Sequence, residues 1–210
     1  MIHFSHFKKS YGRQTVLEIP DLTLSAGIYW IKGANGTGKS TLLKSLAGLL
    51  FFNGDVHLQE ISLKKHPVAY REKVNFGDAE PIFPGFLTGA EMIALFKKAK
   101  GSDPQQDASF ISQMNMEHYL NNPINTYSSG MLKKLSLLLA FMGKPEVILL
   151  DEPLITIDAA SLNTIYNWIT TSYQDKNITF LLSSHQTPDQ NLLPDAIELS
   201  ISGQSLKFPF

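Results

Sequence analysis

The nine residues 33–41 have the types and spacing needed to bind a polyphosphate. Their sequence, Gly-Ala-Asn-Gly-Thr-Gly-Lys-Ser-Thr, fits the pattern G-x-x-x-x-G-K-[ST]. Glycines let the backbone turn sharply and bring its N–H groups close to phosphate oxygens. Lys39 supplies a positive charge for the β- and γ-phosphates, and the Ser40 hydroxyl is placed to bind Mg²⁺. The residues predicted to contact the nucleotide here are Gly33, Ala34, Asn35, Gly36, Thr37, Gly38, Lys39, Ser40 and Thr41.

The segments on either side of this loop decide between a phosphate site and an ordinary glycine-rich turn. Residues 28–31, Ile-Tyr-Trp-Ile, predict a short buried strand, and residues 42–50 predict an apolar helix with leucines spaced for a core face. The helix would begin directly after the loop, so that the positive end of its dipole faces a bound anion. This order of strand, loop and helix favours a nucleotide-binding site.

A second pair of candidate residues, Asp151 and Glu152, directly follows the apolar run 147–150, Val-Ile-Leu-Leu. Such a run is typical of a central strand in a parallel sheet, and ligands of open α/β sheets bind at the carboxyl ends of the strands. There Asp151 can hold Mg²⁺, directly or through water, and Glu152 can polarise a water molecule for attack on the γ-phosphate. Alone, this stretch could equally be a solvated acidic turn, but the phosphate loop upstream favours the magnesium site.

The elements that must position these residues alternate between strand and helix. Residues 1–31 alternate in polarity and predict mostly antiparallel strands, and a terminal hairpin is predicted for residues 196–210. The pattern favours an α/β fold: a mostly parallel sheet, an N-terminal antiparallel β-subdomain and a small helical insertion. The other predicted strands are 54–61, 74–76, 147–150 and 178–182, and the predicted helices are 88–100, with a capping box at Thr88 and Glu91, 107–120, 131–142 and 159–173.

The composition limits the partners of the protein. The 210 residues, 43% hydrophobic and 18% charged, suit one sizeable domain. A net charge of −1 provides no basic field for nucleic acid. The lack of cysteine excludes disulfides and is compatible with a reducing cytoplasm. Since neither a secretory signal nor an apolar run of the ~20 residues that span a bilayer occurs, we expect a soluble protein that reaches a membrane only through a partner.

A third loop, Tyr-Ser-Ser-Gly-Met at residues 127–131, precedes a predicted helix and then the acidic strand. Alone it could be a simple helix cap, but its place resembles the LSGGQ-type signature loop of the ATP-binding subunits of ABC transporters. That resemblance covers essentially the whole chain and implies a P-loop NTPase (RecA-like) fold. Ser128 and Gly130 keep the family's residue type, whereas Ser129 and Met131 depart from it. The resemblance implies that Ser128, Ser129 and Gly130 contact the γ-phosphate of ATP bound to the opposite subunit.

Three further residues gain a role from this resemblance. Asp158 is similar to the aspartate of the family's D-loop, although residues 154–157 are unusually apolar for it; it is an equally good N-cap for the following helix. His185, after a predicted buried strand, is similar to the switch histidine that touches the γ-phosphate, whereas a lone histidine is usually structural. Tyr11 is similar to the aromatic residue that stacks on adenine, the alternative being an ordinary turn tyrosine.

One residue that the resemblance leads us to expect, the Q-loop glutamine near position 79, is missing. The sequence there is Asp78-Ala79-Glu80-Pro81. In the family this loop links Mg²⁺ and the attacking water to the helical insertion that faces the membrane partner. If a carboxylate replaces the glutamine, we expect Asp78 to approach Mg²⁺, since Glu80 abuts Pro81; a metal or a cation must then offset the added charge. Alternatively both side chains are solvated and water fills the place of the glutamine.

The motifs and the resemblance together predict an ATP-binding and ATP-hydrolysing subunit of an ABC transporter, with ATP and Mg²⁺ as cofactors. The predicted catalytic residues are Lys39, Glu152 and His185, and the predicted magnesium ligands are Ser40 and Asp151. Because one chain carries one phosphate loop and one signature loop, we expect a head-to-tail dimer with a second copy or a paralogue. A separate transmembrane permease subunit would hold this dimer on the cytoplasmic face of the cell membrane.

We expect a single ABC ATPase domain over residues 1–210. Within it, residues 1–85 and 131–210 would form the β-subdomain and the core, and residues 86–130 the helical signature subdomain. Two other functions stay open: a non-transport member of the superfamily acting on ribosomes or DNA, and an ATP-binding regulatory module with little turnover, which the altered signature loop would suit. A GTPase is less favoured because the chain has no N-K-x-D motif. The transported substrate and the direction of transport are not indicated.

Overall fold

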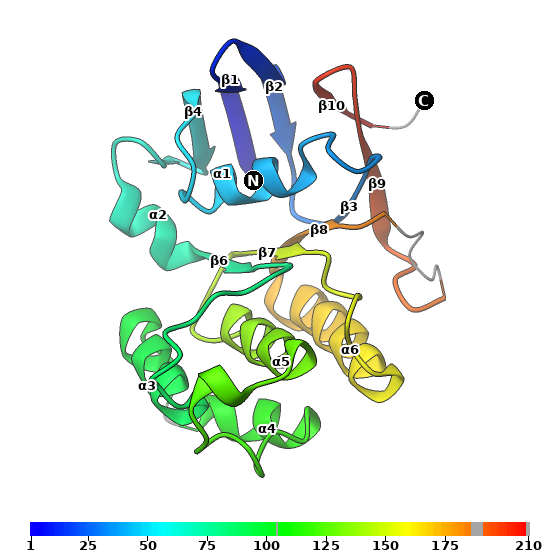
Figure 1. Cartoon of the computed structure of the whole chain (residues 1–210). Helices are drawn as coiled ribbons and strands as arrows, with labels where there is room; N and C mark the ends of the chain where they lie inside the picture. Colours follow the sequence, from blue (N-terminus) through cyan, green and yellow to red (C-terminus); the bar gives the residue numbers. More distant parts are fainter. Residues whose placement is uncertain (104, 186–190, 209–210) are drawn as a thin grey trace.

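The computed structural model describes residues 1–103, 105–185 and 191–208. In Figure 1, strands β1, β2 and β4 gather at one end of the molecule and helices α3 to α6 at the other, with the central strands between them. The elements in chain order are β1 (Ile2–Tyr11), β2 (Gln14–Leu24), β3 (Ile28–Lys32), α1 (Lys39–Leu46), β4 (Asn53–Leu58), β5 (Ile61–Ser62), α2 (Pro67–Lys73), β6 (Val74–Gly77), α3 (Gly89–Lys100), α4 (Gln106–Gln113), a 3₁₀ turn (Ile124–Thr126), α5 (Ser129–Ala140), β7 (Val147–Asp151), α6 (Ala159–Lys176), β8 (Thr179–Ser183), β9 (Ala196–Ser202) and β10 (Ser205–Lys207).

The central sheet has six strands in the order β10-β9-β3-β8-β7-β6. The strands from β9 to β6 run parallel, and β10 pairs with β9 in the antiparallel sense. Side chains of β3 alternate between two cores: Ile28 and Trp30 pack on the side of α5 and α6, and Tyr29 and Ile31 on the side of α1. Because both faces of the sheet are covered, the central strands β3, β7 and β8 are buried along almost their whole length, which confirms the predicted α/β fold.

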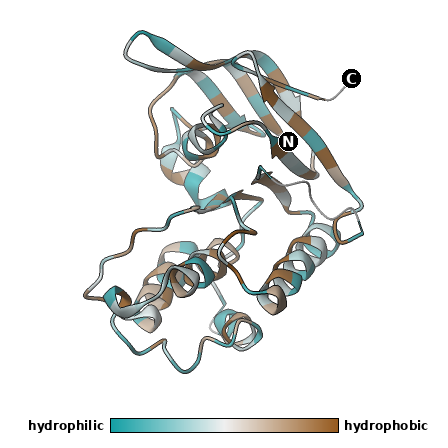
Figure 2. Ribbon diagram, turned by 45° about the vertical axis from the view of Figure 1, so that its right-hand side comes forward, coloured by the Kyte–Doolittle hydropathy of each residue, from teal (hydrophilic) through white to brown (hydrophobic). Residues whose placement is uncertain are grey.

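The second sheet is the predicted antiparallel one, with the order β2-β1-β4-β5. Its strands alternate between hydrophobic and hydrophilic residues along their length in Figure 2, as strands with one buried face do. Pro20 lies within β2. A proline is tolerated there because β2 is an edge strand, where a missing N–H removes no bond between central strands. Helix α1 packs between the two sheets through Leu42, Leu43 and Leu46.

The helical insertion follows the sequence prediction with shifted ends. The capping box of α3 is confirmed, since Thr88 and Glu91 exchange side-chain-to-backbone hydrogen bonds. Helix α4 ends at Gln113, well before the predicted residue 120, and α5 begins at Ser129 instead of 131. Helix α2 was not predicted. Among the residues that the structure describes, no helix combines the length and apolar character required to cross a membrane.

The parallel strands bring the candidate residues to one edge of the central sheet. Asp151, the last residue of β7, lies opposite Ser183, the last residue of β8, and Ser183 in turn lies opposite Ile31 of β3. The phosphate loop leaves β3 at the same edge. The fold therefore places the acidic strand end beside the phosphate loop, as expected for a ligand site at the carboxyl ends of strands.

We predict that Gly54→Ala destabilises the protein through the contact between β4 and β1. Gly54 has a φ of +81°, and a Cβ there would lie 2.0 Å from the carbonyl oxygen of His6. The positive φ and this overlap should together cost at least about 2 kcal/mol of unfolding free energy, or about 4–8 °C in Tm. Gly12→Ala is the control, since Gly12 has a φ of +57° and open space around it. Equal losses of Tm in the two variants would contradict this account.

Candidate functional site

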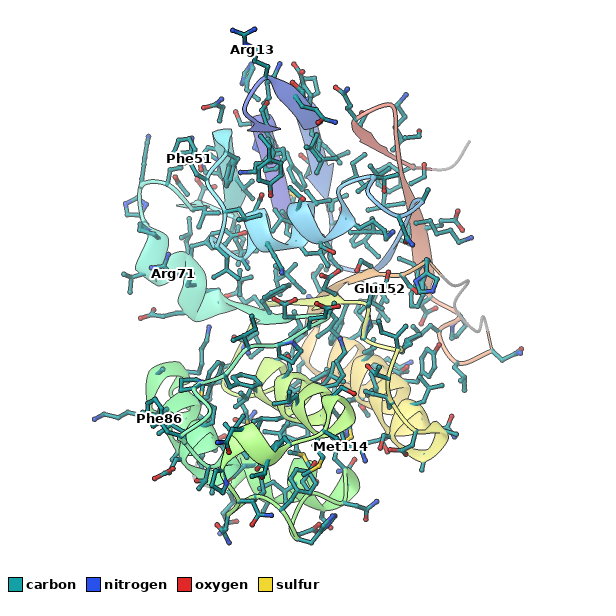
Figure 3. The ribbon with its side chains drawn as sticks, in the orientation of Figure 1. Arg13, Phe51, Arg71, Phe86, Met114 and Glu152 are labelled. Atoms are coloured by element: carbon teal, nitrogen blue, oxygen red, sulfur yellow. The ribbon has the colours of Figure 1, made fainter. Side chains whose placement is uncertain are left out.

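A cleft of about 590 Å³ is bordered by the phosphate loop and by residues that follow the ends of the central strands. Its volume lies within the range of about 300–1,000 Å³ typical of small-molecule sites. Predicted site residues from several separate stretches of sequence meet here, and Glu152 marks the place of the cleft in Figure 3. The lining residues are Tyr11, Val16, Asn35, Gly36, Gly38, Lys39, Ser40, Thr41, Ala79, Glu80, Glu152, Ile155 and His185.

The phosphate loop has a backbone that requires glycine. A Cβ on Gly33 would lie 2.5 Å from the Thr37 hydroxyl oxygen, and Gly38 has a φ of +103°. As the N-cap of α1, Gly38 has no side chain to accept from the first-turn N–H groups, so these donors remain for an anion. The buried Lys39 donates from Nζ to the carbonyl oxygens of Gly33 at 2.7 Å and Ala34 at 3.2 Å. The ammonium group is therefore held against the loop at the edge of the cleft.

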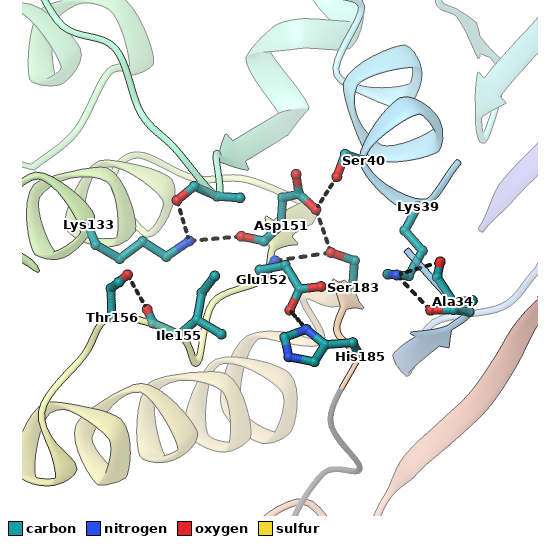
Figure 4. A network of polar contacts seen from close by, with 12 residues as sticks. Ala34, Lys39, Ser40, Lys133, Asp151, Glu152, Ile155, Thr156, Ser183 and His185 are labelled. Atoms are coloured by element: carbon teal, nitrogen blue, oxygen red, sulfur yellow. Dashed lines mark hydrogen bonds and ion pairs between the residues drawn. The ribbon is translucent and has the colours of Figure 1, made fainter. Parts of the chain in front are cut away.

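The carboxylate of Asp151 joins three elements at the floor of the site. The Ser40 hydroxyl of α1 and the Ser183 hydroxyl of β8 both donate to its Oδ1, at 3.0 and 2.5 Å. The Ser183 oxygen also accepts the N–H of Glu152 at 3.0 Å. Figure 4 shows this chain of hydrogen bonds. Carboxylate and hydroxyl oxygens are the ligands that Mg²⁺ prefers in proteins, so Ser40 and Asp151 fit that ion.

Glu152 and His185 form a pair at the wall of the cleft. Nδ1 of His185 lies 3.1 Å from Oε2 of Glu152, and the two side chains are 48% and 14% exposed. Glu152 has a φ of +44°, an uncommon conformation for a non-glycine residue. The bond from its N–H to Ser183 helps to hold that conformation. The structure thus brings together two of the residues predicted to be catalytic, with their polar atoms in contact.

Tyr11 also borders the cleft, at the end of β1. Its side chain is 52% exposed, and Nζ of Lys9 lies 4.4 Å from the centre of its ring. The same ammonium group donates to the carbonyl oxygen of Phe51 at 2.8 Å. A cation above one face of the ring restrains the ring and leaves the aromatic side chain at the mouth of the cleft.

The signature loop starts α5 outside this cleft. Ser128 is the N-cap, and its Oγ accepts the N–H of Met131 at 3.3 Å. None of the residues 128–130 lines the cleft. Asp158 is confirmed as the N-cap of α6, and its carboxylate lies 2.9 Å from Nζ of Lys134. That ammonium group and the N–H of Ser161 hold the pKa of Asp158 well below its usual range.

The loop after β6 differs from the expectation for Asp78. The Asp78 carboxylate pairs with Nζ of Lys44 at 3.0 Å, alongside α1, and it is not among the lining residues of the cleft. Ala79 and Glu80 do line the cleft. The geometry therefore does not support the prediction that Asp78 rather than Glu80 approaches Mg²⁺, because Asp78 pairs with Lys44 outside the cleft.

Two residues that sequence reasoning missed contribute to the site. Ser183, directly after the predicted strand 178–182, bonds to both Asp151 and Glu152. Lys133 was not singled out, yet its buried Nζ donates to the carbonyl oxygen of Asp151 at 2.8 Å. Burial lowers the pKa of Lys133 to about 8. A serine at the end of a strand beside the acidic one was the available signal for Ser183; a lysine within a helix gave no comparable signal.

Comparison with known proteins identifies relatives along most of the chain. The family model described as ABC transporter matches residues 17–155. The cytochrome c biogenesis ATP-binding export protein CcmA of Legionella pneumophila (strain Lens) is 34% identical over 179 residues, which cover 84% of this chain and 88% of that protein. ABC transporter A family member 1 of Dictyostelium discoideum is 31% identical over 207 residues, 95% of this chain. The chain spans only 23% of the length of that relative.

Solved structures share the fold. The chain superposes on an ATP-binding subunit of an ABC transporter with a TM-score of 0.86 and 22% identity, covering 99% of this chain and 88% of the other. A dimeric ATP-binding cassette in a post-hydrolysis state, bound to ADP and Pi, gives a TM-score of 0.84 at 18% identity, with 99% of this chain and 98% of that chain covered. At these identities the likeness shows the fold, and it agrees with the predicted α/β architecture.

We predict that Ser183→Ala lowers the free energy of unfolding by about 1.5–3 kcal/mol, because the buried Asp151 carboxylate and the Glu152 N–H lose a common partner. Urea denaturation measures the loss. Ser45→Ala is the matched control: Ser45 is equally buried, but its hydroxyl donates only to a neutral carbonyl, that of Thr41, at 2.7 Å. A loss at Ser183 no larger than that at Ser45 would argue against a charge-assisted network.

Proposed function

The chain belongs to the ABC transporter family, and on that premise we propose that it binds and hydrolyses ATP as the subunit that powers a membrane transporter. The observation that carries this proposal is the meeting of Ser40, Asp151 and Glu152 beside the phosphate loop. Hydrolysis of a nucleoside triphosphate needs hydrogen-bond donors for the phosphate oxygens, ligands for Mg²⁺ and a base near the γ-phosphate, and this site has residues for all three. We propose the division into a core and a helical subdomain at residues 86–130 on the same basis.

The phosphate loop suits a charged ligand. Lys39 can exchange its two carbonyl acceptors for phosphate oxygens, which carry charge and bind an ammonium group more strongly. The N–H groups at the start of α1 point their dipole toward the same anion. Ser40 and Asp151 would hold Mg²⁺, which when bound neutralises part of the phosphate charge. Tyr11, at the mouth of the cleft, is the residue that we propose to stack on adenine.

Glu152 is the general base that we propose. Its carboxylate is mostly shielded from solvent but borders the cleft, so it can accept a proton from a water molecule next to the γ-phosphate. His185 contacts Oε2 and can hold the carboxylate in one orientation. The hydrogen bond from the Glu152 N–H to Ser183 ties this base to the strand that also supports Asp151.

A head-to-tail dimer is part of the proposal. Residues 128–130 are at the start of a helix, where N–H groups attract an anion, yet they do not border the cleft of their own chain. A second chain facing this one can bring its signature loop to the phosphate end of the cleft. Two chains would then enclose two ATP molecules.

A membrane partner is supported by exposed apolar residues in the loop that leads into the helical insertion. Ile82 and Phe86, in the loop between β6 and α3, are 96% and 82% exposed. Phe51, after α1, is a further exposed apolar residue at 79%. Figure 3 shows both phenylalanines on the left side of the view, Phe51 beside the antiparallel strands and Phe86 beside α3. Exposed apolar side chains mark an interaction surface where they are grouped, as Ile82 and Phe86 are within one loop. We propose that a transmembrane permease subunit contacts them, which would hold the protein on the cytoplasmic face of the membrane.

We predict that Glu152→Gln slows ATP hydrolysis by about 10²-fold or more, the scale expected for loss of a general base, without preventing ATP binding. ATP should then trap the dimer, because hydrolysis can no longer reopen it. Light scattering of the variant with and without Mg-ATP measures the change in mass. A strict monomer in both conditions would contradict the head-to-tail mechanism.

Two further variants serve as controls for the trapped dimer. Adding Ser128→Arg should abolish it, because a bulky side chain would enter the opposing phosphate site. Adding Lys39→Ala should abolish it by removing ATP affinity while leaving the fold intact. A dimer that survives Lys39→Ala would form without bound nucleotide, and a Lys39→Ala single variant with normal hydrolysis would refute the phosphate-loop assignment.

The loop without the glutamine gives a separate prediction. Because Glu80 borders the cleft and Asp78 pairs with Lys44, we predict that Glu80→Ala changes the Mg²⁺ concentration for half-maximal hydrolysis and that Asp78→Ala does not. Hydrolysis rates across a Mg²⁺ titration measure both. If only Asp78→Ala has an effect, the sequence-based prediction that Asp78 approaches Mg²⁺ is supported instead. If neither variant has an effect, the result supports the alternative that water takes the place of the glutamine.

A further inference from the structure

Lys133, in the second turn of α5, is only 1% exposed, although lysine is rarely buried without a partner. Its Nζ donates to the carbonyl oxygens of Asp151 at 2.8 Å and Asp78 at 3.0 Å, and lies 3.5 Å from that of Ala79. Figure 4 shows the Lys133 side chain reaching from its helix to Asp151. The ammonium group is thus bound by the backbone of two other segments of the chain.

These carbonyl groups stand where two neighbouring parallel strands end. β6 and β7 are paired with Gly77 opposite Leu150, so Asp78 and Asp151 are the next residues on each. The carboxylates of Asp151, Asp78 and Glu152 all favour a positive charge at Lys133 and oppose the effect of its burial. Carbonyl dipoles and acidic neighbours together offset the cost of burying the ammonium group.

We propose that Lys133 is a positioning residue of the nucleotide site. Its ammonium group ties the loop after β6 and the end of β7 to the signature helix, so that Asp151 and Glu152 keep their places beside the phosphate loop. The loop that it supports is the one in which the glutamine is missing, and the lysine itself does not border the cleft. The inference rests on the proposed ATPase function, and one arm of its test does not depend on activity.

Lys100 provides a matched control within the same chain. Its Nζ donates to the carbonyl oxygens of Arg71, in α2, and of Val74, the first residue of β6, and burial likewise lowers its pKa to about 8. Replacing either lysine with methionine keeps the aliphatic stem and removes an ammonium group bound to carbonyls. The two variants differ in which end of β6 loses this support, and only the Lys133 end lies next to the cleft.

The first arm measures steady-state ATP hydrolysis by the full chain. Loss of a residue that orients the ligating groups commonly costs about 10–100-fold, so Lys133→Met should lower kcat by at least about tenfold. The KM for ATP should change by less than about threefold, because the phosphate loop is intact. Lys100→Met should keep kcat within about twofold of the wild type. A kcat for Lys133→Met within twofold of the wild type, or an equal loss in Lys100→Met, would overturn the proposal.

The second arm measures backbone hydrogen exchange of the nucleotide-free protein. Lys133→Met should speed exchange at residues 79–82 and 152–155 by at least about tenfold, whereas Lys100→Met should not, because local opening is governed by local contacts. Unchanged exchange at both segments would overturn the proposal. If the wild type hydrolyses no ATP, the proposed function fails, and this arm alone then decides the role of Lys133.

Two milder variants keep the test decisive if Lys133→Met does not fold. Lys133→Arg retains the charge and the donors, and Lys133→Gln retains a donor without charge. We expect kcat to fall in the order wild type, Lys133→Arg, Lys133→Gln. A Lys133→Gln protein with the kcat and exchange rates of the wild type would show that the cation positions nothing.

Discussion

The buried carboxylate of Asp151 is the constraint on which the site depends. Asp151 is 1% exposed, and a buried carboxylate needs hydrogen-bond donors. Its Oδ1 accepts hydrogen bonds from the hydroxyls of Ser40 and Ser183. These bonds require that Asp151 of β7 lies opposite Ser183 of β8 and that the first turn of α1 brings Ser40 next to both. A slip of one residue between the strands would turn the carboxylate to the other face of the sheet. The register of the central sheet and the geometry of the phosphate loop are therefore set together.

The sequence predicted the parts of the site whose chemistry is local. The phosphate loop and the acidic strand end each depend on residues a few positions apart, and the structure contains both; the same holds, outside the site, for the capping box of α3. It did not predict Ser183 or Lys133, because their roles depend on strand register and on a helix packing across two strand ends. A lysine within a helix is ordinarily solvated, so its burial becomes visible only in three dimensions.

In the loop after β6, too, the orientation of a side chain depends on packing that the sequence does not reveal. Asp78 and Glu80 have the same charge, and the neighbouring Pro81 favoured Asp78 in the sequence, whereas the structure places Glu80 at the cleft. Lys44 decides it, because it lies on the side of α1 where it can pair with Asp78 at 3.0 Å. The Asp78 carboxylate is therefore paired with Lys44 of α1, and the Asp78 carbonyl oxygen accepts a hydrogen bond from Lys133 of α5. Both helices were predicted, but the pairing of their lysines with this loop was not.

Helix α5 joins the signature residues to the nucleotide cleft of its own chain. Its carboxyl end is held by Asn75 of β6, whose Nδ2 donates to the carbonyl oxygens of Ala140 at 2.8 Å and Met142 at 2.7 Å. Its second turn is held by Lys133 at the far ends of β6 and β7. Both attachments are buried and both involve β6 or the residue after it, so a shift of the amino end of α5 would strain them. A second chain that contacts residues 128–130 would therefore act on the strand that carries Asp151 through one helix rather than through a flexible loop.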